Sequence, residues 1–126
     1  RRCGWLDAVA LRRMVSLNGV TGFCVTKLDV LDGFDEIRIC TAYRLNGQLL
    51  DAPPLDVQDW ARLEPVYETF PGWQETSRGA TRMEDRPANA RSYLEAMESL
   101  CGAPIHIVST GPDRNENIVI RYPFDL

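Results

Sequence analysis

The sequence predicts a mixed α/β fold in which helices pack against a mixed sheet. Residues 8–18 and 87–101 repeat apolar side chains at helical spacing, and a glycine follows each segment. Short runs rich in β-branched and aromatic residues lie between and after them, which is typical of strands. The 126 residues show no internal repeat and no linker, so we expect one unit spanning residues 1–126.

The first helix is expected over residues 8–18. Asp7 suits its N-cap, and Gly19 stands where a helix C-terminus needs a stop. The helix should bury one apolar face and expose Arg12 and Arg13 on the other side. The residues expected on the apolar face are Leu6, Val9, Ala10, Met14 and Leu17.

A short buried strand is expected over residues 20–26, followed by a turn at 30–33. Residues 36–45 read as a strand with Ile37, Ile39 and Thr41 on one side. Asn46-Gly47 is a strong two-residue hairpin signal, so a return strand should cover residues 48–50.

The remaining elements follow from turn residues and apolar spacing. Residues 51–59 hold Pro53-Pro54 and are expected to form a loop, and 64–70 a strand. Residues 74–86 are polar and weakly patterned, which predicts an exposed excursion before the second helix. A strand over 104–108, a tight loop over 109–112 and a final strand over 117–122 complete the chain.

Composition excludes some classes of function. The net charge is -4, with 18 acidic against 14 basic residues, which argues against a nucleic-acid partner. No apolar run approaches the ~20 residues of a membrane span, and no signal peptide is visible. Cys24 and Cys40 lie in apolar runs and should pack as small hydrophobic residues, which favours a reduced, cytoplasmic setting. The chain begins without Met, so we expect a piece of a longer protein.

The segment Thr26-Lys27-Leu28-Asp29 is the candidate binding motif, because polar residues at the end of a buried strand are typical of α/β sites. Guanine presents two donors side by side, N1–H and the 2-amino group, and the single carboxylate of Asp29 can accept both. Adenine has an acceptor at N1 and lacks the 2-amino group. The aliphatic stem of Lys27 can lie along the purine ring. The alternative is a strand end with two solvated charges.

A second loop could complete a guanine pocket. Ser109-Thr110-Gly111 follows another apolar strand, and its backbone N–H groups could donate to the guanine O6 carbonyl. The alternative is a simple turn. No G-x-x-x-x-G-K-[ST] loop occurs, so the site for the triphosphate should lie on sequence outside this chain.

Other candidate residues point to structure rather than chemistry. His106 lies on a strand without a nucleophile pattern beside it and is expected to be structural or at the surface. Acidic residues 59, 64 and 68 are not spaced as an acid/base pair, and the cysteines and single histidine do not suggest a zinc site. We therefore expect no catalytic and no metal-binding residue here. Trp5, Trp60 and Trp73 are expected to be packing or loop anchors.

The chain resembles the C-terminal third of the adenylosuccinate synthetases, a GTP-dependent ligase family. The matching words, in order, are Arg1 to Asp7, Leu17 to Gly19, Gly22 to Gly33, Tyr67 to Trp73 and Ser109 to Arg114, and the resemblance continues to Pro123-Phe124-Asp125.

The resemblance implies the C-terminal part of a P-loop-related fold and a role in purine nucleotide synthesis. The family joins IMP to L-aspartate at the expense of GTP, with Mg²⁺ and a 6-phosphoryl-IMP intermediate, as a cytoplasmic homodimer. It implies that GTP is contacted by Arg1, Lys27, Leu28, Asp29, Ser109, Thr110 and Gly111. The family's catalytic Asp and His, its phosphate loop and its Mg²⁺ ligands lie upstream, so the chain alone is expected to be inactive.

Two other interpretations remain open at this stage. A guanine-nucleotide switch module would also use Thr26-Lys27-x-Asp29, but the segment from Tyr67 to Trp73 and the Asn46-Gly47 hairpin do not suit it. The third interpretation is a structural α/β fragment without retained ligand affinity.

Overall fold

The computed structural model describes residues 4–77, 86–111 and 115–120. Its elements, in chain order, are β1 (Leu6–Asp7), α1 (Ala8–Asn18), β2 (Phe23–Val25), the 3₁₀ helix η1 (Leu28–Leu31), β3 (Glu36–Leu45), β4 (Gln48–Leu50), α2 (Val57–Trp60), β5 (Glu64–Pro71), α3 (Ala88–Cys101), β6 (Ile105–Ser109) and β7 (Asn117–Val119). The expected mixed α/β class is confirmed.

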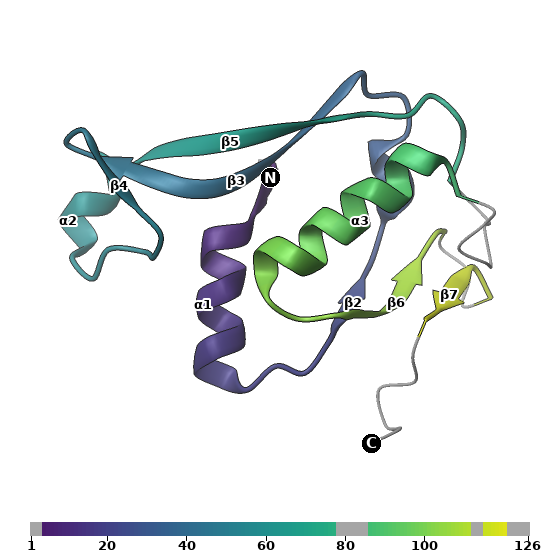
Figure 1. Ribbon diagram of the computed structural model, residues 1–126, viewed down its shortest axis with the longest axis horizontal. Helices are drawn as coiled ribbons and strands as arrows, with labels where there is room; N and C mark the ends of the chain where they lie inside the picture. Colours follow the sequence, from purple (N-terminus) through teal and green to yellow (C-terminus); the bar gives the residue numbers. More distant parts are fainter. Residues whose placement is uncertain (1–3, 78–85, 112–114, 121–126) are drawn as a thin grey trace.

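The strands form two sheets. In the first, β3 pairs with β1 in parallel and with β4 and β5 in antiparallel. In the second, β6 lies between β2, which runs parallel to it, and β7, which runs antiparallel. Figure 1 shows α3 lying between the long β3–β5 ribbon and this smaller sheet. The main core agrees, because it joins residues of α3 to Ile37 and Ile39 on one side and to Ile105 and Val108 on the other.

Helix α1 has the predicted bounds because its caps are local. The Asp7 carboxylate accepts from the N–H of Ala10 at 3.1 Å, and Gly19 adopts the left-handed conformation at φ 61°. The predicted apolar face is wrong in its second half, since Met14 is 54% exposed and Leu17 is 64% exposed. The buried residues of α1 are Ala8 and Val9, and both lie in its first turn.

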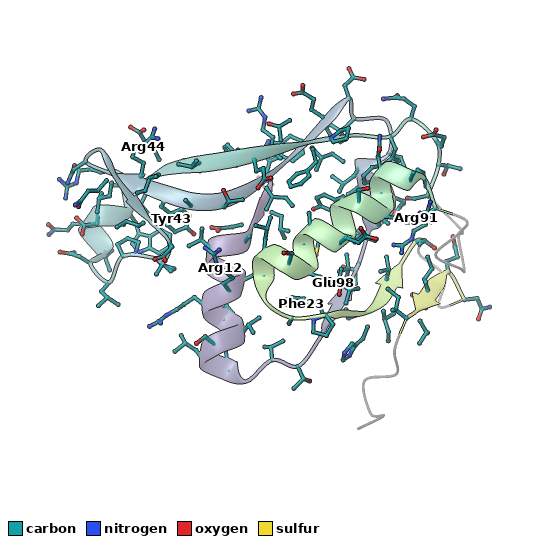
Figure 2. The ribbon with its side chains drawn as sticks, viewed as in Figure 1. Arg12, Phe23, Tyr43, Arg44, Arg91 and Glu98 are labelled. Carbon is teal, nitrogen blue, oxygen red and sulfur yellow. The ribbon has the colours of Figure 1, made fainter. Side chains whose placement is uncertain are left out.

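Arg12 corrects the expectation of a solvated pair on α1. Its guanidinium donates to the carbonyl oxygens of Thr41, at 3.4 Å, and of Asp51, at 3.2 Å. The side chain of Arg12, labelled in Figure 2, therefore joins α1 to β3 and to the residue that follows β4. Arg13 is exposed, as expected.

Strand β3 buries Ile37 and Ile39 completely, as its alternation predicts. The register then shifts between Cys40 and Ala42, which places Cys40 and Tyr43 in a second small core with Val9. The alternation predicted as far as Thr41 is therefore interrupted by a bulge. The Tyr43 hydroxyl donates to the carboxylate of Asp7, which joins β3 to the N-cap of α1.

Other expectations need correction. The loop predicted over 51–59 contains the start of α2, capped by the Asp56 carboxylate, which accepts from the N–H of Gln58 at 3.0 Å. The strand predicted over 20–26 covers only Phe23–Val25, and Cys24 is exposed rather than packed. The excursion predicted over 74–86 is exposed at Gln74, Glu75 and Thr76, as expected, but Ser77 and Arg86 are buried. Its centre, 78–85, and residues 121–122 of the predicted last strand lie outside the described residues.

Trp73 and His106 have the structural roles that the sequence predicts. Trp73 is buried, and its ring packs against Tyr93 of α3 with 6.1 Å between the ring centroids. His106 is buried on β6, where its ring occupies the space that a side chain at Gly22 would need. None of the helices in the described part of the chain is long and apolar enough to cross a membrane.

Candidate guanine-binding site

The parallel pairing of β2 and β6 brings the two predicted loops to one edge of the smaller sheet. Val25 lies opposite Val108, so both strands reach their carboxyl ends at the same level. In Figure 1 the chain leaves β2 and β6 in the same direction. Neighbouring strands lie about 4.8 Å apart. The segments Thr26–Asp29 and Ser109–Gly111 therefore begin side by side, at a location where open α/β sheets commonly bind ligands.

Lys27 turns the chain from β2 into η1. It adopts the left-handed conformation at φ 59° and ψ 38°, which is uncommon for a residue with a side chain. The turn is held by hydrogen bonds from the N–H of Val30 to the carbonyl of Lys27, at 3.2 Å, and from the N–H of Asp32 to the carbonyl of Asp29, at 3.1 Å. The left-handed conformation of Lys27 therefore determines the direction in which the chain runs from β2 into η1.

The three side chains after Thr26 lie in different environments. Leu28 is 2% exposed and belongs to the main core, so its side chain anchors η1 rather than facing a ligand. Lys27 is exposed and Asp29 is half-buried. Within residues 4–77, 86–111 and 115–120, the Asp29 carboxylate has no hydrogen bond or ion pair. Asp29 therefore has acceptor capacity available for a ligand.

In the second loop, residues 109–111, fewer backbone N–H groups are free to bind a ligand than the sequence predicts. The backbone N–H of Thr110 donates to the carbonyl of Glu116 at 2.7 Å, and its hydroxyl donates to the same oxygen at 3.0 Å. Thr110 is fully buried, so it closes the loop instead of facing a ligand. The Ser109 hydroxyl donates to the carbonyl of Gly111 at 3.1 Å. The backbone N–H of Gly111 has no partner among the described residues, and the side-chain carboxylate of Glu116 lies against this glycine.

A cavity of about 260 Å³ lies beside Lys27. The N-terminal segment, the end of β2 and helix α3 all contribute to its walls. Its lining residues are Gly4, Trp5, Leu6, Val25, Thr26, Lys27, Leu28, Val30, Leu31, Tyr93 and Met97.

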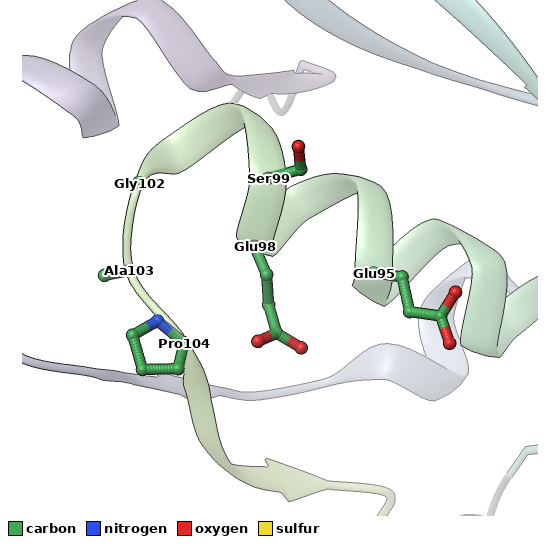
Figure 3. A pocket seen from close by; sticks show the side chains of 6 residues that line it. All are labelled: Glu95, Glu98, Ser99, Gly102, Ala103 and Pro104. Carbon is green, nitrogen blue, oxygen red and sulfur yellow. The ribbon is translucent and has the colours of Figure 1, made fainter.

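A shallower depression of about 470 Å³ is separate from this edge. Figure 3 shows it along the end of α3, with the Glu98 side chain next to Pro104 and the Glu95 side chain further back along the helix. Pro104 immediately precedes β6, whereas the candidate site follows β6. The depression therefore lies at the opposite end of that strand and adds nothing to the candidate site.

The described residues offer no metal centre. Within 4–77, 86–111 and 115–120, His, Cys, Asp and Glu side chains form no group of three or more that could hold a metal ion. Arg1, the remaining predicted GTP contact, lies outside the described residues.

The sequence gives no signal for Asp32, which anchors the motif. Its carboxylate accepts from the indole N–H of Trp73, 41 residues away, at 2.5 Å, and from the hydroxyl of Ser77, 45 residues away, at 2.8 Å. Partners at such separations leave no local pattern, so only the fold reveals the contact.

Comparison with known proteins identifies the family. The protein-family profile described as adenylosuccinate synthetase matches residues 1–118, and the chain belongs to this family. The chain is similar to adenylosuccinate synthetase 1, chloroplastic, of Ricinus communis, with 60% identity over 98% of this chain and 28% of the relative. It is 58% identical to adenylosuccinate synthetase of Methylobacillus flagellatus, again over 98% of this chain and 28% of the relative.

The fold of this chain is also similar to that of a solved structure. The structure of fully ligated adenylosuccinate synthetase from Plasmodium falciparum is similar with a TM-score of 0.90 and 36% identity, over 96% of this chain and 30% of that chain. The expected family and the mixed α/β class are confirmed. This chain spans less than a third of the length of these relatives.

Proposed function

We propose that this chain forms the guanine-reading part of a GTP-dependent adenylosuccinate synthetase. The observation that supports the proposal is the parallel β2–β6 register in a chain of this family, because it aligns the ends of the two strands that lead to Asp29 and to Gly111. In the proposed contact, the Asp29 carboxylate accepts from guanine N1–H and the 2-amino group. The N–H of Gly111 donates to O6, and the stem of Lys27 lies along the ring.

The proposed contact discriminates between purines by hydrogen-bond polarity. Adenine would present a lone pair at N1 to the carboxylate of Asp29 and an amino group to the N–H of Gly111. Both positions would then lack a complementary partner, and each unpaired buried group costs ~1–3 kcal/mol. Leu28 and Thr110 would shape the pocket through their buried side chains, and Ser109 would hold the loop through its bond to the Gly111 carbonyl.

The full-length protein is proposed to join IMP and L-aspartate, with GTP phosphorylating IMP to a 6-phosphoryl intermediate before aspartate attacks. The described residues do not supply a metal site. By resemblance to the family, Mg²⁺ is proposed to be bound by residues upstream of this chain. By resemblance, Arg1 is proposed to contact the nucleotide. A homodimer and a cytoplasmic setting are also proposed, although one similar protein carries "chloroplastic" in its name.

The alternative, a guanine-nucleotide switch module, is not favoured, because the matching family profile and relatives are all synthetases. The test is adenylosuccinate formation by the purified full-length protein from IMP, L-aspartate and Mg²⁺ with GTP, with ATP in a parallel reaction. We expect turnover with GTP and at least tenfold lower kcat/KM with ATP. The reason is that adenine would leave one or two hydrogen-bonding groups unpaired, and a free-energy cost of ~1.4 kcal/mol corresponds to a tenfold change. No product with either nucleotide would overturn the proposal. The 126-residue chain alone should give no turnover.

A further inference from the structure

Asp32 receives more hydrogen bonds than any neighbouring side chain of the candidate site in the described part of the chain. It ends η1, three residues after Asp29. One carboxylate oxygen accepts from Trp73 Nε1 at 2.5 Å and Ser77 Oγ at 2.8 Å. The other accepts from the backbone N–H of Ser77 at 2.9 Å and Thr76 Oγ1 at 3.4 Å. Hydrogen bonds to an ionised acceptor are about twice as strong as neutral ones.

The partners of Asp32 form a rigid support. Trp73 is 2% exposed and Ser77 is fully buried, and both follow β5. The Trp73 ring packs against Tyr93 of α3, and the Trp73 carbonyl accepts from the N–H of Gly33 at 2.9 Å. The segment is therefore fixed to α3 and to the residues after η1. A carboxylate bonded to this segment cannot shift without breaking bonds to buried donors.

Asp32 is also connected to the base-reading residue through the backbone. Its N–H donates to the carbonyl of Asp29 at 3.1 Å, across the single turn of η1. Leu28 holds the other end of that turn in the core. The orientation of Asp29 thus depends on a 3₁₀ turn held at one end by Leu28 and at the other by Asp32.

We infer that Asp32 is a positioning residue for nucleotide recognition, which holds η1 so that the Asp29 carboxylate meets the guanine base in one orientation. The inference rests on the proposed function. Recognition geometry must be held within about 0.5 Å by supporting hydrogen bonds, so loosening Asp32 should weaken nucleotide binding without changing which base is preferred. In this arrangement Asp29 contacts the guanine base, and Asp32 fixes the position of Asp29.

The test is steady-state kinetics of the full-length protein carrying Asp32→Asn. The Asn oxygen can still accept from Trp73, but its amino group then faces the N–H of Ser77, donor against donor. We expect the KM for GTP to rise roughly tenfold, the equivalent of ~1.4 kcal/mol. The kcat at saturation and the KM for IMP should change less than threefold, and XTP should gain no activity.

Asp35→Asn is the matched control. Asp35 also bridges to the segment after β5, since its carboxylate accepts from Gln74 Nε2 at 3.1 Å, but this bond is exposed and lies beyond η1. The control should leave the KM for GTP within about twofold, because exposed pairs contribute little. Trp73→Phe removes one donor to Asp32 and retains an aromatic ring, so it should raise the KM for GTP less than Asp32→Asn does. It replaces Asp32→Asn as the test variant if Asp32→Asn does not fold.

Two outcomes would overturn the inference. One is an unchanged KM for GTP in both Asp32→Asn and Trp73→Phe. The other is an equal rise in the KM values for GTP, IMP and L-aspartate accompanied by a lower Tm, which would assign Asp32 a general role in stability. Failure of the proposed function would give a different result. The base preference of Asp29 variants would then be unchanged, independently of the kinetics of Asp32→Asn.

Discussion

Val25 of β2 lies opposite Val108 of β6 in a parallel register, and this pairing places the two loops of the candidate site beside each other. Asp29 of the first loop and Ser109 of the second are 80 positions apart in the sequence. No local sequence pattern indicates that the two loops meet. A parallel pair differs from a hairpin in this respect, since it needs a long crossover between its strands. The relationship therefore depends on the fold as a whole.

A close backbone approach near the support of η1 gives a test of stability. A Cβ added at Gly72 would lie 1.9 Å from the carbonyl oxygen of Phe34, and the Gly72 N–H already donates to the carbonyl of Asp35 at 2.9 Å. Backbone atoms cannot move aside as a flexible side chain can. Gly72→Ala should destabilise the protein by about 1–3 kcal/mol, as overpacking does.

The matched control for this substitution is Gly4→Ala, because a Cβ at Gly4 would meet no atom of the described residues within 4 Å. Thermal unfolding of the two full-length variants provides the comparison, with a clearly lower Tm expected for Gly72→Ala alone. Equal Tm values would show that the contact between Gly72 and Phe34 relaxes without cost.

Burial of Tyr93 predicts a loss of stability in alkali. Burial, with a smaller contribution from Cys101, raises the pKa of Tyr93 to about 12 from an ordinary value of 10.0. Between these values the unfolded chain loses the phenol proton while the folded chain retains it. The stabilisation is therefore complete below pH 10 and is lost as the pH rises towards 12, by up to ~1.4 kcal/mol per pH unit.

Tyr93→Phe removes the titrating group and keeps the ring that packs against Trp73. The free energy of unfolding of this variant should fall less steeply than that of the parent between pH 10 and pH 12, whereas the two slopes should agree below pH 9. Urea unfolding at a series of pH values measures both slopes. Parallel curves throughout the alkaline range would show that Tyr93 does not contribute.

Local signals in the sequence predict much of this fold. The caps at Asp7 and Gly19 set the bounds of α1, and the Asn46-Gly47 hairpin joins β3 to β4 as expected. Where prediction fails, the cause is a distant contact. Helical periodicity shows that Leu17 belongs to an apolar stripe, but the stripe gives no information about which part of it a neighbouring element covers.

The candidate site divides in the same way. Residue chemistry indicates Asp29 and the loop after β6, and the parallel register brings the two segments together. The sequence does not reveal that the N–H of Thr110 is already occupied by Glu116, or that Asp32 is held by Trp73. Both contacts depend on elements that meet only in the folded chain.

The most direct test of the central claim is the nucleotide preference of the full-length protein carrying Asp29→Asn. The Asn oxygen can accept from guanine N1–H, but its amino group would face the 2-amino group, donor against donor. Xanthine has a carbonyl at that position and would be matched. An unpaired donor costs ~1–3 kcal/mol, so the KM for GTP should rise roughly 10- to 100-fold while kcat falls much less, and XTP should gain activity. An unchanged KM for GTP, or no gain with XTP, would contradict the assignment of Asp29 as the residue that reads the base.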